Sequence, residues 1–346
     1  RAAIRDLVFD ALRCRRSFAA LGGGEETGRA LMLGWLRARG EAPTAWMTGV
    51  RHALAPPGPA EVPAPELDEL EALDCPDWLA PRLRADLGDD FARVMGALRH
   101  RADVFLRVHA GRTSRADAIA RLAADGISAE PHPLAGTALR VTGGARRVHL
   151  CAAYRDGLVE LQDAASQAVC AAIPLPRDGP VLDLCAGGGG KALALAARGA
   201  RVSAHDADPG RMRDLPGRAR RARNAIEILG PDELSGLSGR PLVVADVPCS
   251  GSGAWRRQPE AKWRLSPARL DDLTRQQAGI LQRAAGLAQP GGMVAYVTCS
   301  ILAAENDAIV GAFLGRHPGW SLGQVRRFLP SEGGDGFYLA LLRRET

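Results

Sequence analysis

Two cysteines in the second half of the chain follow segments with the apolar character of buried strands. Cys249 lies in the run Asp-Val-Pro-Cys-Ser that begins at Asp246, and Cys299 in the run Val-Thr-Cys-Ser that begins at Val297. The cysteines of the chain form no Cys-x-x-Cys pair, so neither a zinc site nor a disulfide scaffold is expected. A single buried cysteine is usually an inert packing residue. Two at equivalent strand ends favour nucleophilic, covalent chemistry.

A glycine-rich loop follows the first apolar strand of this half. It reads Asp-Leu-Cys-Ala-Gly-Gly-Gly-Gly-Lys from Asp183 to Lys191, and a helix is expected over 192–197. Residues without side chains let the backbone approach a ligand in front of a helix N-terminus, which predicts a nucleotide-like cofactor; a purely structural turn is the alternative. Asp206, about 20 residues further on, offers a carboxylate to a ribose hydroxyl. Ala192 stands where a phosphate loop needs Ser or Thr, which disfavours nucleotide hydrolysis.

These motifs require a framework that brings strand ends together. From about residue 179 strands and helices alternate, which predicts a doubly wound, Rossmann-like α/β domain with a parallel sheet covered on both faces. The expected strands are 181–185, 201–205, 242–246, 293–298 and 336–342. In such sheets ligands bind beyond the carboxyl ends of the strands, at the point where the strand order reverses. The glycine loop and both cysteines follow such ends.

The first 150 or so residues have a different pattern of expected helices and strands. Apolar residues at helical spacing predict a helical N-terminal region, and a proline-rich stretch at 55–65 predicts a linker within it. A strand at 104–108, a helix at 115–124 capped by Ser114 and a strand at 138–141 predict a small β-α-β unit. The expected domains are 1–95 (helical), 96–150 (small α/β) and 151–346 (doubly wound).

Composition bounds the class of protein. The chain has 346 residues, of which 46% are hydrophobic and 24% charged, as in an ordinary folded protein of more than one domain. It contains no apolar run of about 18 residues and no leader-like segment, so we expect a cytoplasmic, monomeric protein without membrane contact. The net charge of +6 favours a polyanionic partner. Only two basic residues are lysines, Lys191 and Lys262.

With these motifs the chain resembles the Fmu/RsmB branch of the Sun/Nop-type RNA cytosine-5 methyltransferases. The resemblance covers about the last 190 residues. It extends through 157–163, 256–260, 262–263, 290–292, Glu305-Asn306 and 334–338. Upstream, 75–79 and the strand at 105–108 resemble the family's RNA-binding region more loosely, which implies an RRM-like small unit.

The resemblance implies a mechanism. C5 of cytosine is a poor nucleophile, so a thiolate must first add to C6 and convert the ring into an enamine. In the family this thiol belongs to the Thr-Cys motif, here Cys299, while the second cysteine, here Cys249, assists release. Asp246 matches the carboxylate that binds the amidine edge of the base, and Lys191 matches the lysine beside cofactor and target. S-adenosylmethionine is the implied cofactor.

The cofactor site is expected to combine the glycine loop with three carboxylates. Its residues are Cys185, Ala186, Gly187, Gly188, Gly189, Gly190, Lys191, Asp206, Asp232 and Asp246. The family's loop usually reads Cys-Ala-Ala-Pro-Gly-Gly-Lys-Thr, so Gly187, Gly188 and Ala192 are departures. The segment from Asp206 to Asp246 also looks short, and Asp232 is the candidate there for an adenine contact.

Basic residues supply the expected RNA contacts. Arg256, Arg257 and Lys262 follow the Cys249 loop and are expected at the mouth of the site. The arginine-rich stretch 211–223 binds phosphates or forms a solvated helix face. Ribosomal RNA is the favoured substrate and transfer RNA the second. A DNA cytosine-5 methyltransferase would use its Pro-Cys cysteine as the nucleophile and lack Thr-Cys, while a non-catalytic RNA-binding or assembly factor would retain the fold alone.

Overall fold

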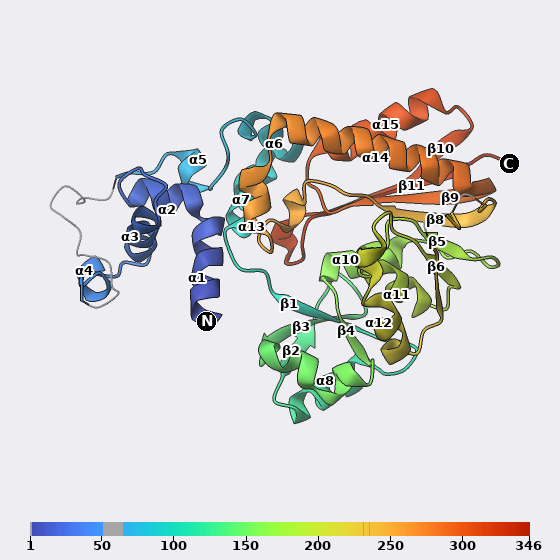
Figure 1. Cartoon of the computed structure of the whole chain (residues 1–346), viewed down its shortest axis with the longest axis horizontal. Coiled ribbons are helices and arrows are strands. Elements are labelled where there is room, and N and C mark those ends of the chain that lie inside the picture. The colour runs from blue at the N-terminus through green and yellow to red at the C-terminus, as the bar shows by residue number, and fades with distance from the viewer. Residues whose placement is uncertain (1, 51–64, 231, 235) are drawn as a thin grey trace. The chain divides into compact units, whose positions relative to one another are not determined.

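A computed structural model describes residues 2–50, 65–230, 232–234 and 236–346 (Figure 1). These form two compact units. The first contains Arg1–Arg101 and Ala254–Arg264, and the second contains Ala102–Gly253 and Leu265–Thr346. The linker expected at 55–65 lies, except for Pro65, outside the described residues. No helix within the described part of the chain is long and apolar enough to cross a membrane.

The first unit is helical, as expected. Its helices are α1 (Ala2–Arg13), α2 (Arg15–Leu21), α3 (Gly28–Ala38), α4 (Pro43–Trp46), α5 (Glu69–Ala72), α6 (Ala80–Leu87), α7 (Phe91–Leu98) and α13 (Pro259–Arg264). Helix α3 begins where the Thr27 side chain accepts a hydrogen bond from the backbone N–H of Ala30. Its apolar face buries Leu33 and Leu36 completely. Gly34 on this helix lets the backbone of α2 come close, because a Cβ at Gly34 would lie 1.8 Å from the Phe18 carbonyl oxygen.

Helix α13 joins this unit from far along the sequence. The indole Nε1–H of Trp263 donates to the backbone oxygen of Leu12 (2.6 Å), and Arg13 Nε donates to the backbone oxygen of Arg256 (2.7 Å). Residues 254–264 therefore fold with the N-terminal helices and not with the rest of the region expected as one domain, 151–346.

The second unit contains a small four-stranded antiparallel sheet. Its elements are β1 (Val104–Val108), α8 (Arg115–Ala124), β2 (Ser128–Pro131), β3 (Ala138–Gly143), α9 (Ala152–Arg155) and β4 (Val159–Leu161). The strand order β2-β3-β1-β4 and the βαββαβ sequence are those of a ferredoxin-like fold. The expected β1 and α8 are present, with Ser114 as the N-cap of α8. The short strands β2 and β4 were not predicted, and β4 lies beyond the expected boundary at residue 150.

The larger sheet has seven strands. They are β5 (Val181–Asp183), β6 (Val202–Ala204), β7 (Ile226–Ile228), β8 (Arg240–Asp246), β9 (Ala288–Thr298), β10 (Trp320–Phe328) and β11 (Phe337–Arg344). They are ordered β10-β11-β9-β8-β5-β6-β7, with β7, β6, β5, β8 and β9 parallel and β11 antiparallel to β9. The doubly wound, Rossmann-like class is confirmed. Strands β7 and β10 were missed because both are largely exposed and lack a buried apolar run.

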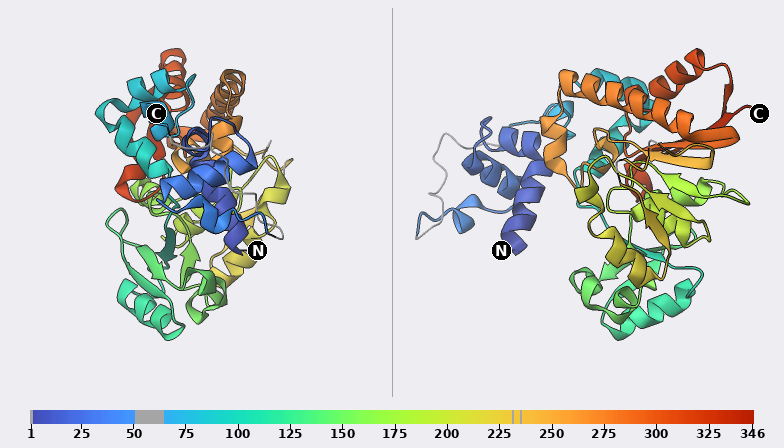
Figure 2. Two further views of the ribbon diagram at one scale, coloured as in Figure 1. Left: turned by 90° about the vertical axis from the view of Figure 1, so that its left-hand side faces the viewer. Right: turned by 45° about the vertical axis from the view of Figure 1, so that its right-hand side comes forward.

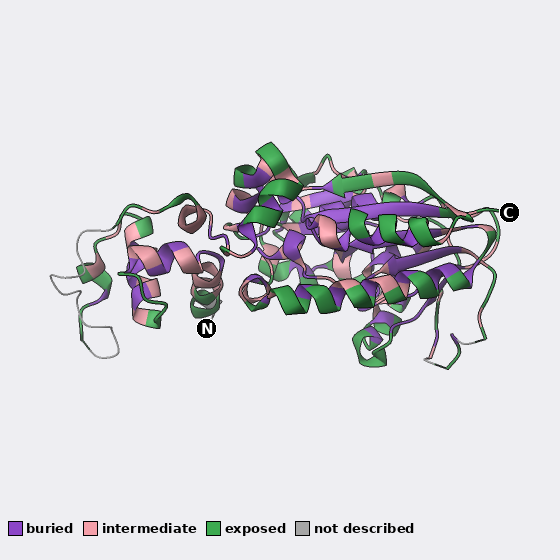
Figure 3. Cartoon of the chain, turned by 90° about the horizontal axis from the view of Figure 1, so that it is seen from above, coloured by how far each residue is buried: buried purple, intermediate pink, exposed green. Residues whose placement is uncertain are grey.

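Helices cover both faces of this sheet (Figure 2). Helices α10 (Ala164–Ala172), α11 (Gly190–Ala196) and α12 (Leu215–Ala222) pack on one face, and α14 (Pro267–Leu287) and α15 (Asp307–Arg316) on the other. The strands are buried between two apolar clusters, while the helices carry exposed outer stripes (Figure 3). The reversal of strand order falls between β5 and β8, because β5 continues to β6 on its other side.

Replacing Gly34 by alanine tests the close approach of α2 and α3. The added methyl group would overlap the Phe18 carbonyl, so Gly34→Ala should destabilise the protein by about 1–3 kcal/mol despite the better helix propensity of alanine. Gly28→Ala in the same helix meets nothing within 4 Å and is the control. Thermal unfolding should show a lower midpoint for Gly34→Ala alone; equal midpoints would contradict the packing argument.

Candidate active site

The two cysteine-bearing loops meet at the carboxyl edge of the larger sheet. Strands β8 and β9 are parallel with Asp246 opposite Val297, so the loops that follow them leave the sheet side by side. As a result the Sγ atoms of Cys249 and Cys299 lie 3.3 Å apart, within contact distance. The sequence placed both cysteines at strand ends, and the structure brings them together. All seven cysteines of the chain are free thiols.

Burial and the neighbouring sulfur both act on the Cys249 thiol. The pKa of Cys249 is raised well above its ordinary value, first by its hydrogen bond with Cys299 and then by burial. The raised pKa keeps Cys249 a neutral thiol in the resting protein. A neutral thiol that donates to a neighbouring sulfur stabilises negative charge there.

Lys191 and Asp246 form an ion pair beside these cysteines. Lys191 Nζ lies 2.7 Å from Asp246 Oδ2, and the lysine is 7% exposed. Burial by itself lowers the pKa of Lys191, but the Asp246 carboxylate and the nearby Cys170 and Cys299 thiols outweigh burial and raise it overall. The ammonium also lies over the ring of Phe337, 4.9 Å from its centroid. Lys191 is thus a fixed positive charge close to Cys299.

The glycine loop connects β5 to α11 through two residues with positive φ. Gly187 has φ +51° and Gly189 has φ +81°, conformations that L side chains rarely adopt. The Gly187 N–H donates to Asp206 Oδ2 (2.9 Å), so the carboxylate expected for a ribose holds the loop. A Cβ at Gly189 would lie 2.2 Å from Leu215 Cδ1, so this apolar side chain packs directly against the loop.

Two arginines accompany the unusual glycines of this loop. Arg211 pairs with Asp206 (3.1 Å), and its Nη2 lies 3.1 Å from where a Gly187 Cβ would be. Arg218 donates to the Gly188 carbonyl oxygen and pairs with Glu160. Side chains at 187 and 188 would crowd both guanidinium groups. The stretch 211–223 thus supplies loop contacts, a role that its charge pattern did not reveal.

Asp183, at the end of β5, is an important residue that the site prediction omitted. It is 0% exposed, and within the described residues no side chain donates a hydrogen bond to its carboxylate, toward which the backbone N–H of Ala192 lies. Burial, followed by the charge of Asp246, raises its pKa to about 7, and Asp206 contributes in the same direction. Three carboxylates thus converge at the ends of β5, β6 and β8. The signal in the sequence was the acidic residue that opens the glycine motif.

The other expected cofactor residues occupy simpler positions. Cys185 is partly buried, and burial raises the pKa of its thiol to about 12. The Ala186 N–H donates to the backbone oxygen of His205 (2.8 Å), which ties the loop to the end of β6. Asp232 is exposed and follows β7 by four residues, so its adenine contact stays a prediction.

The expected RNA contacts of the segment after Cys249 require correction. Lys262 is 1% exposed, its Nζ donates to the Arg13 carbonyl oxygen (3.2 Å), and burial lowers its pKa to about 8. Arg256 is 6% exposed. Such burial within the helical unit does not agree with phosphate contacts for either side chain. Arg257 is partly exposed, and its RNA contact stays a prediction.

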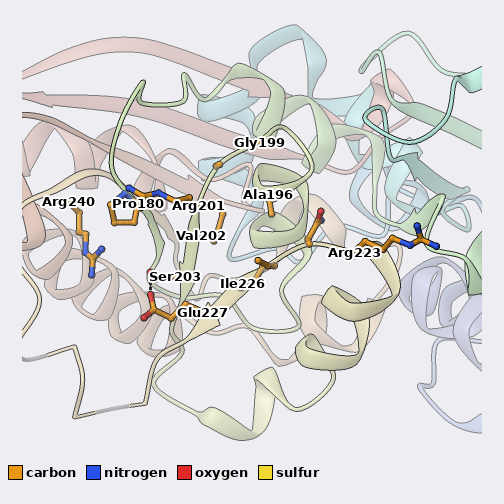
Figure 4. A pocket seen from close by; sticks show the side chains of 13 residues that line it. Pro180, Ala196, Gly199, Arg201, Val202, Ser203, Arg223, Ile226, Glu227 and Arg240 are labelled. Atoms are coloured by element: carbon orange, nitrogen blue, oxygen red, sulfur yellow. Dashed lines mark hydrogen bonds between the residues drawn. The ribbon is translucent and has the colours of Figure 1, made fainter.

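A pocket of about 690 Å³ lies at the opposite edge of the sheet (Figure 4). Its lining includes Pro180, Arg201 and Arg240, which adjoin the amino ends of β5, β6 and β8. Ser203 donates to Glu227 within it (2.6 Å). The cysteines and the glycine loop follow the carboxyl ends of the strands, so this pocket belongs to another part of the molecule.

Fold and site together define a protein of the Rossmann-like methyltransferase class with paired cysteines. The model of the 16S rRNA methyltransferase RsmB/F family matches residues 172–343, and that of the RsmF/B-like ferredoxin-like domain matches residues 75–148. The chain belongs to the RsmB/F methyltransferase family.

Curated relatives agree with this assignment, and a solved structure shares the fold. Ribosomal RNA small subunit methyltransferase B of Xanthomonas campestris is 33% identical over 299 residues, covering 78% of this chain and 67% of the relative. The protein of the same name from Yersinia pestis is 32% identical over 281 residues, covering 77% and 65%. The chain thus spans about two thirds of the length of these relatives. A methyltransferase homolog protein from Pyrococcus horikoshii shares the fold, with a TM-score of 0.69 and 21% identity over 80% of this chain and 98% of its own.

Family membership makes S-adenosylmethionine the cofactor of this chain. The residues present fit that group. Asp183, Asp206 and Asp246 form an acidic cluster in which no side chain of the described residues donates to the Asp183 carboxylate, and such a cluster fits a ligand with a sulfonium and an ammonium group. The glycine loop supplies the close backbone approach.

Asp183→Asn tests the buried carboxyl. Because the pKa of Asp183 is raised in the folded protein, the folded state holds a proton that the unfolded chain releases, so the contribution of Asp183 to stability falls as pH rises from about 4 to about 7. The variant lacks this loss. Its stability relative to the wild type should therefore increase between pH 5 and pH 8 in urea unfolding. Asp178→Asn, at an exposed position, should show no such trend. A difference between Asp183→Asn and the wild type that does not change with pH would contradict the assignment.

Proposed function

We propose that the protein is an RNA (cytosine-C5) methyltransferase that acts on ribosomal RNA through a covalent Cys299–C6 adduct. The observation that carries the proposal is the 3.3 Å contact of the Cys249 and Cys299 Sγ atoms beside the Lys191–Asp246 ion pair. One sulfur is poised to attack and the other to exchange a proton.

Cys299 begins the reaction as a thiolate. The Cys249 thiol and the Lys191 ammonium both stabilise negative charge on its sulfur. The thiolate forms a bond to C6 of cytosine, and the ring electrons move to make C5 nucleophilic. Asp246, partly exposed and oriented by Lys191, accepts hydrogen bonds from the amidine edge of the base as the adduct forms.

The glycine loop and the acidic cluster are the groups that would hold the cofactor. S-adenosylmethionine, when bound, supplies the electrophilic methyl group that C5 accepts. The glycine loop and the Asp183, Asp206 and Asp246 carboxylates would hold it there. Burial of Asp183 and Asp206 excludes water from these two carboxyl groups and strengthens their interaction with a cation.

Cys249 acts in the second half of the reaction. The C5 proton must leave so that the electrons can return and expel the Cys299 sulfur from C6. While Cys299 is bonded to C6, it no longer receives the Cys249 proton as a thiolate, so the largest cause of the raised Cys249 pKa is absent. The Cys249 thiol then loses its own proton to water more readily, and the resulting thiolate accepts the C5 proton.

The substrate class comes from the relatives. Both curated relatives described above are named as ribosomal RNA small subunit methyltransferases. The net charge of +6 agrees with a polyanionic substrate. Purified small-subunit RNA should therefore accept methyl groups faster than transfer RNA, and bisulfite sequencing should map the product to a cytosine. A faster reaction with transfer RNA would replace ribosomal RNA by the alternative substrate.

The two cysteines should fail differently when replaced. Cys299→Ala cannot form the C6 bond, so methyl transfer should fall by on the order of 10³-fold or more and no covalent complex should appear. Cys249→Ala can still form the adduct but releases it slowly, so a protein–RNA species should accumulate on denaturing electrophoresis.

Cys151→Ala is the matched control, since Cys151 is buried in the small-sheet region away from the paired thiols. It should lower stability without a trapped complex. Accumulation of the adduct in Cys299→Ala, with normal turnover in Cys249→Ala, would reverse the two roles and favour the DNA-methylase-like arrangement. Loss of turnover in all three variants to the same extent would indicate packing roles only.

A further inference from the structure

Glu305 lies behind both cysteine-bearing loops. It ends the short 3-10 helix Ala303–Glu305, and it is 0% exposed although its side chain is acidic. A buried carboxylate is tolerated only where hydrogen-bond donors replace its lost hydration. The identity of those donors therefore reveals what this side chain holds.

The donors come from the residues that directly follow the two cysteines. Glu305 Oε1 accepts from the Ser250 backbone N–H (2.8 Å), and Oε2 accepts from the hydroxyl groups of both Ser250 and Ser300. Gln277 of α14 donates to Oε1 (2.9 Å) and also to the Pro248 carbonyl oxygen (2.9 Å). Both carboxylate oxygens are thus satisfied, and each cysteine has a neighbour bound to the same group.

Neighbouring polar contacts complete the connection. Asn306 accepts from the Thr298 hydroxyl (2.6 Å) and donates to the Ser300 carbonyl oxygen (3.0 Å), on either side of Cys299. The Ser252 and Ser300 hydroxyls lie 2.9 Å apart, and the Gly253 N–H donates to the Cys299 carbonyl oxygen (3.0 Å). Removing the central acceptor would leave several buried donors without a partner, which is costly.

We propose that Glu305 is a positioning residue that holds the Cys249 and Cys299 loops together, and so sets the contact between their sulfur atoms. The inference rests on the proposed function for its role in the reaction, because that function needs one sulfur bonded to C6 while the other exchanges a proton close by. Glu305 positions the loops through Ser250 and Ser300, and its charge adds to the raised pKa of Cys249.

The contact between the sulfurs can be measured without RNA or cofactor. Diamide removes two electrons and two protons from a pair of adjacent thiols, is itself reduced to the hydrazine, and leaves an S–S bond. The rate at which the Cys249–Cys299 disulfide forms in the full chain, followed by peptide mass spectrometry, therefore reports how often the sulfurs meet. The wild type should react rapidly, because the two sulfurs already lie 3.3 Å apart.

Three variants distinguish a role of Glu305 in positioning the two sulfur atoms from a role in packing alone. Glu305→Ala removes every acceptor and should slow disulfide formation at least about tenfold. Glu305→Gln should stay within about threefold of the wild type, because its amide oxygen can still accept from Ser250 N–H while its amide nitrogen donates to the two hydroxyls. Asp307→Ala removes the adjacent carboxylate, which pairs with Arg327, and should react as the wild type does.

The methylation assay gives the second measurement. Glu305→Ala should lower kcat with little change in the KM for RNA, and the glutamine variant should restore most of the rate. Disulfide formation at the wild-type rate in Glu305→Ala would overturn the positioning role and leave the proposed function intact. Absence of RNA methylation by the wild type would overturn the proposed function and leave the disulfide comparison valid.

If Glu305→Ala does not fold, a variant with a smaller change still tests the proposal. The double variant Ser250→Ala, Ser300→Ala removes the two hydroxyl groups that share Oε2 and leaves the carboxylate in place. Circular dichroism and thermal unfolding establish that the protein is folded before oxidation. Slower disulfide formation in this variant supports the proposal, and the wild-type rate overturns it.

Discussion

The parallel pairing of β5, β8 and β9 is the constraint on which the rest of the molecule depends. Parallel strands end at the same edge of a sheet, so residues that are 50 positions apart in sequence, such as Cys249 and Cys299, arrive together without any covalent link. The helices on both faces make the strands buried and rigid. The position of a side chain just past a strand end is therefore fixed by the rigid sheet.

Electrostatics then gives each group at this edge a different character. Three carboxylates converge there: Asp246 is paired with Lys191, Asp206 holds the Gly187 amide, and Asp183 receives no side-chain hydrogen bond from the described residues. Burial makes these differences large, because the interior screens charge weakly. Similar residue types thereby serve as an ion-pair partner, a loop anchor and a buried acid.

Sequence reasoning recovered those parts of the fold that have a strong local signal. The strand at 104–108 and the helix after Ser114 were found because apolar residues and a cap mark them, whereas the exposed strands β7 and β10 carry no such pattern. The cysteine pair was predicted from strand ends. Lys262 was misread, because its partners lie about 250 residues away in sequence and a lysine in a basic stretch usually faces solvent.

The excursion of residues 254–264 into the helical unit has a consequence for synthesis. Synthesis on the ribosome proceeds from the N-terminus to the C-terminus. More than 150 residues must therefore be made after residue 101 before Trp263 of α13 can donate its hydrogen bond to the backbone oxygen of Leu12. During that interval the surface that α13 will cover is open. The N-terminal helices therefore reach their final form only after strands β5 to β8 of the larger sheet have been made, and a fragment cut at the end of α7 lacks a part of its own core.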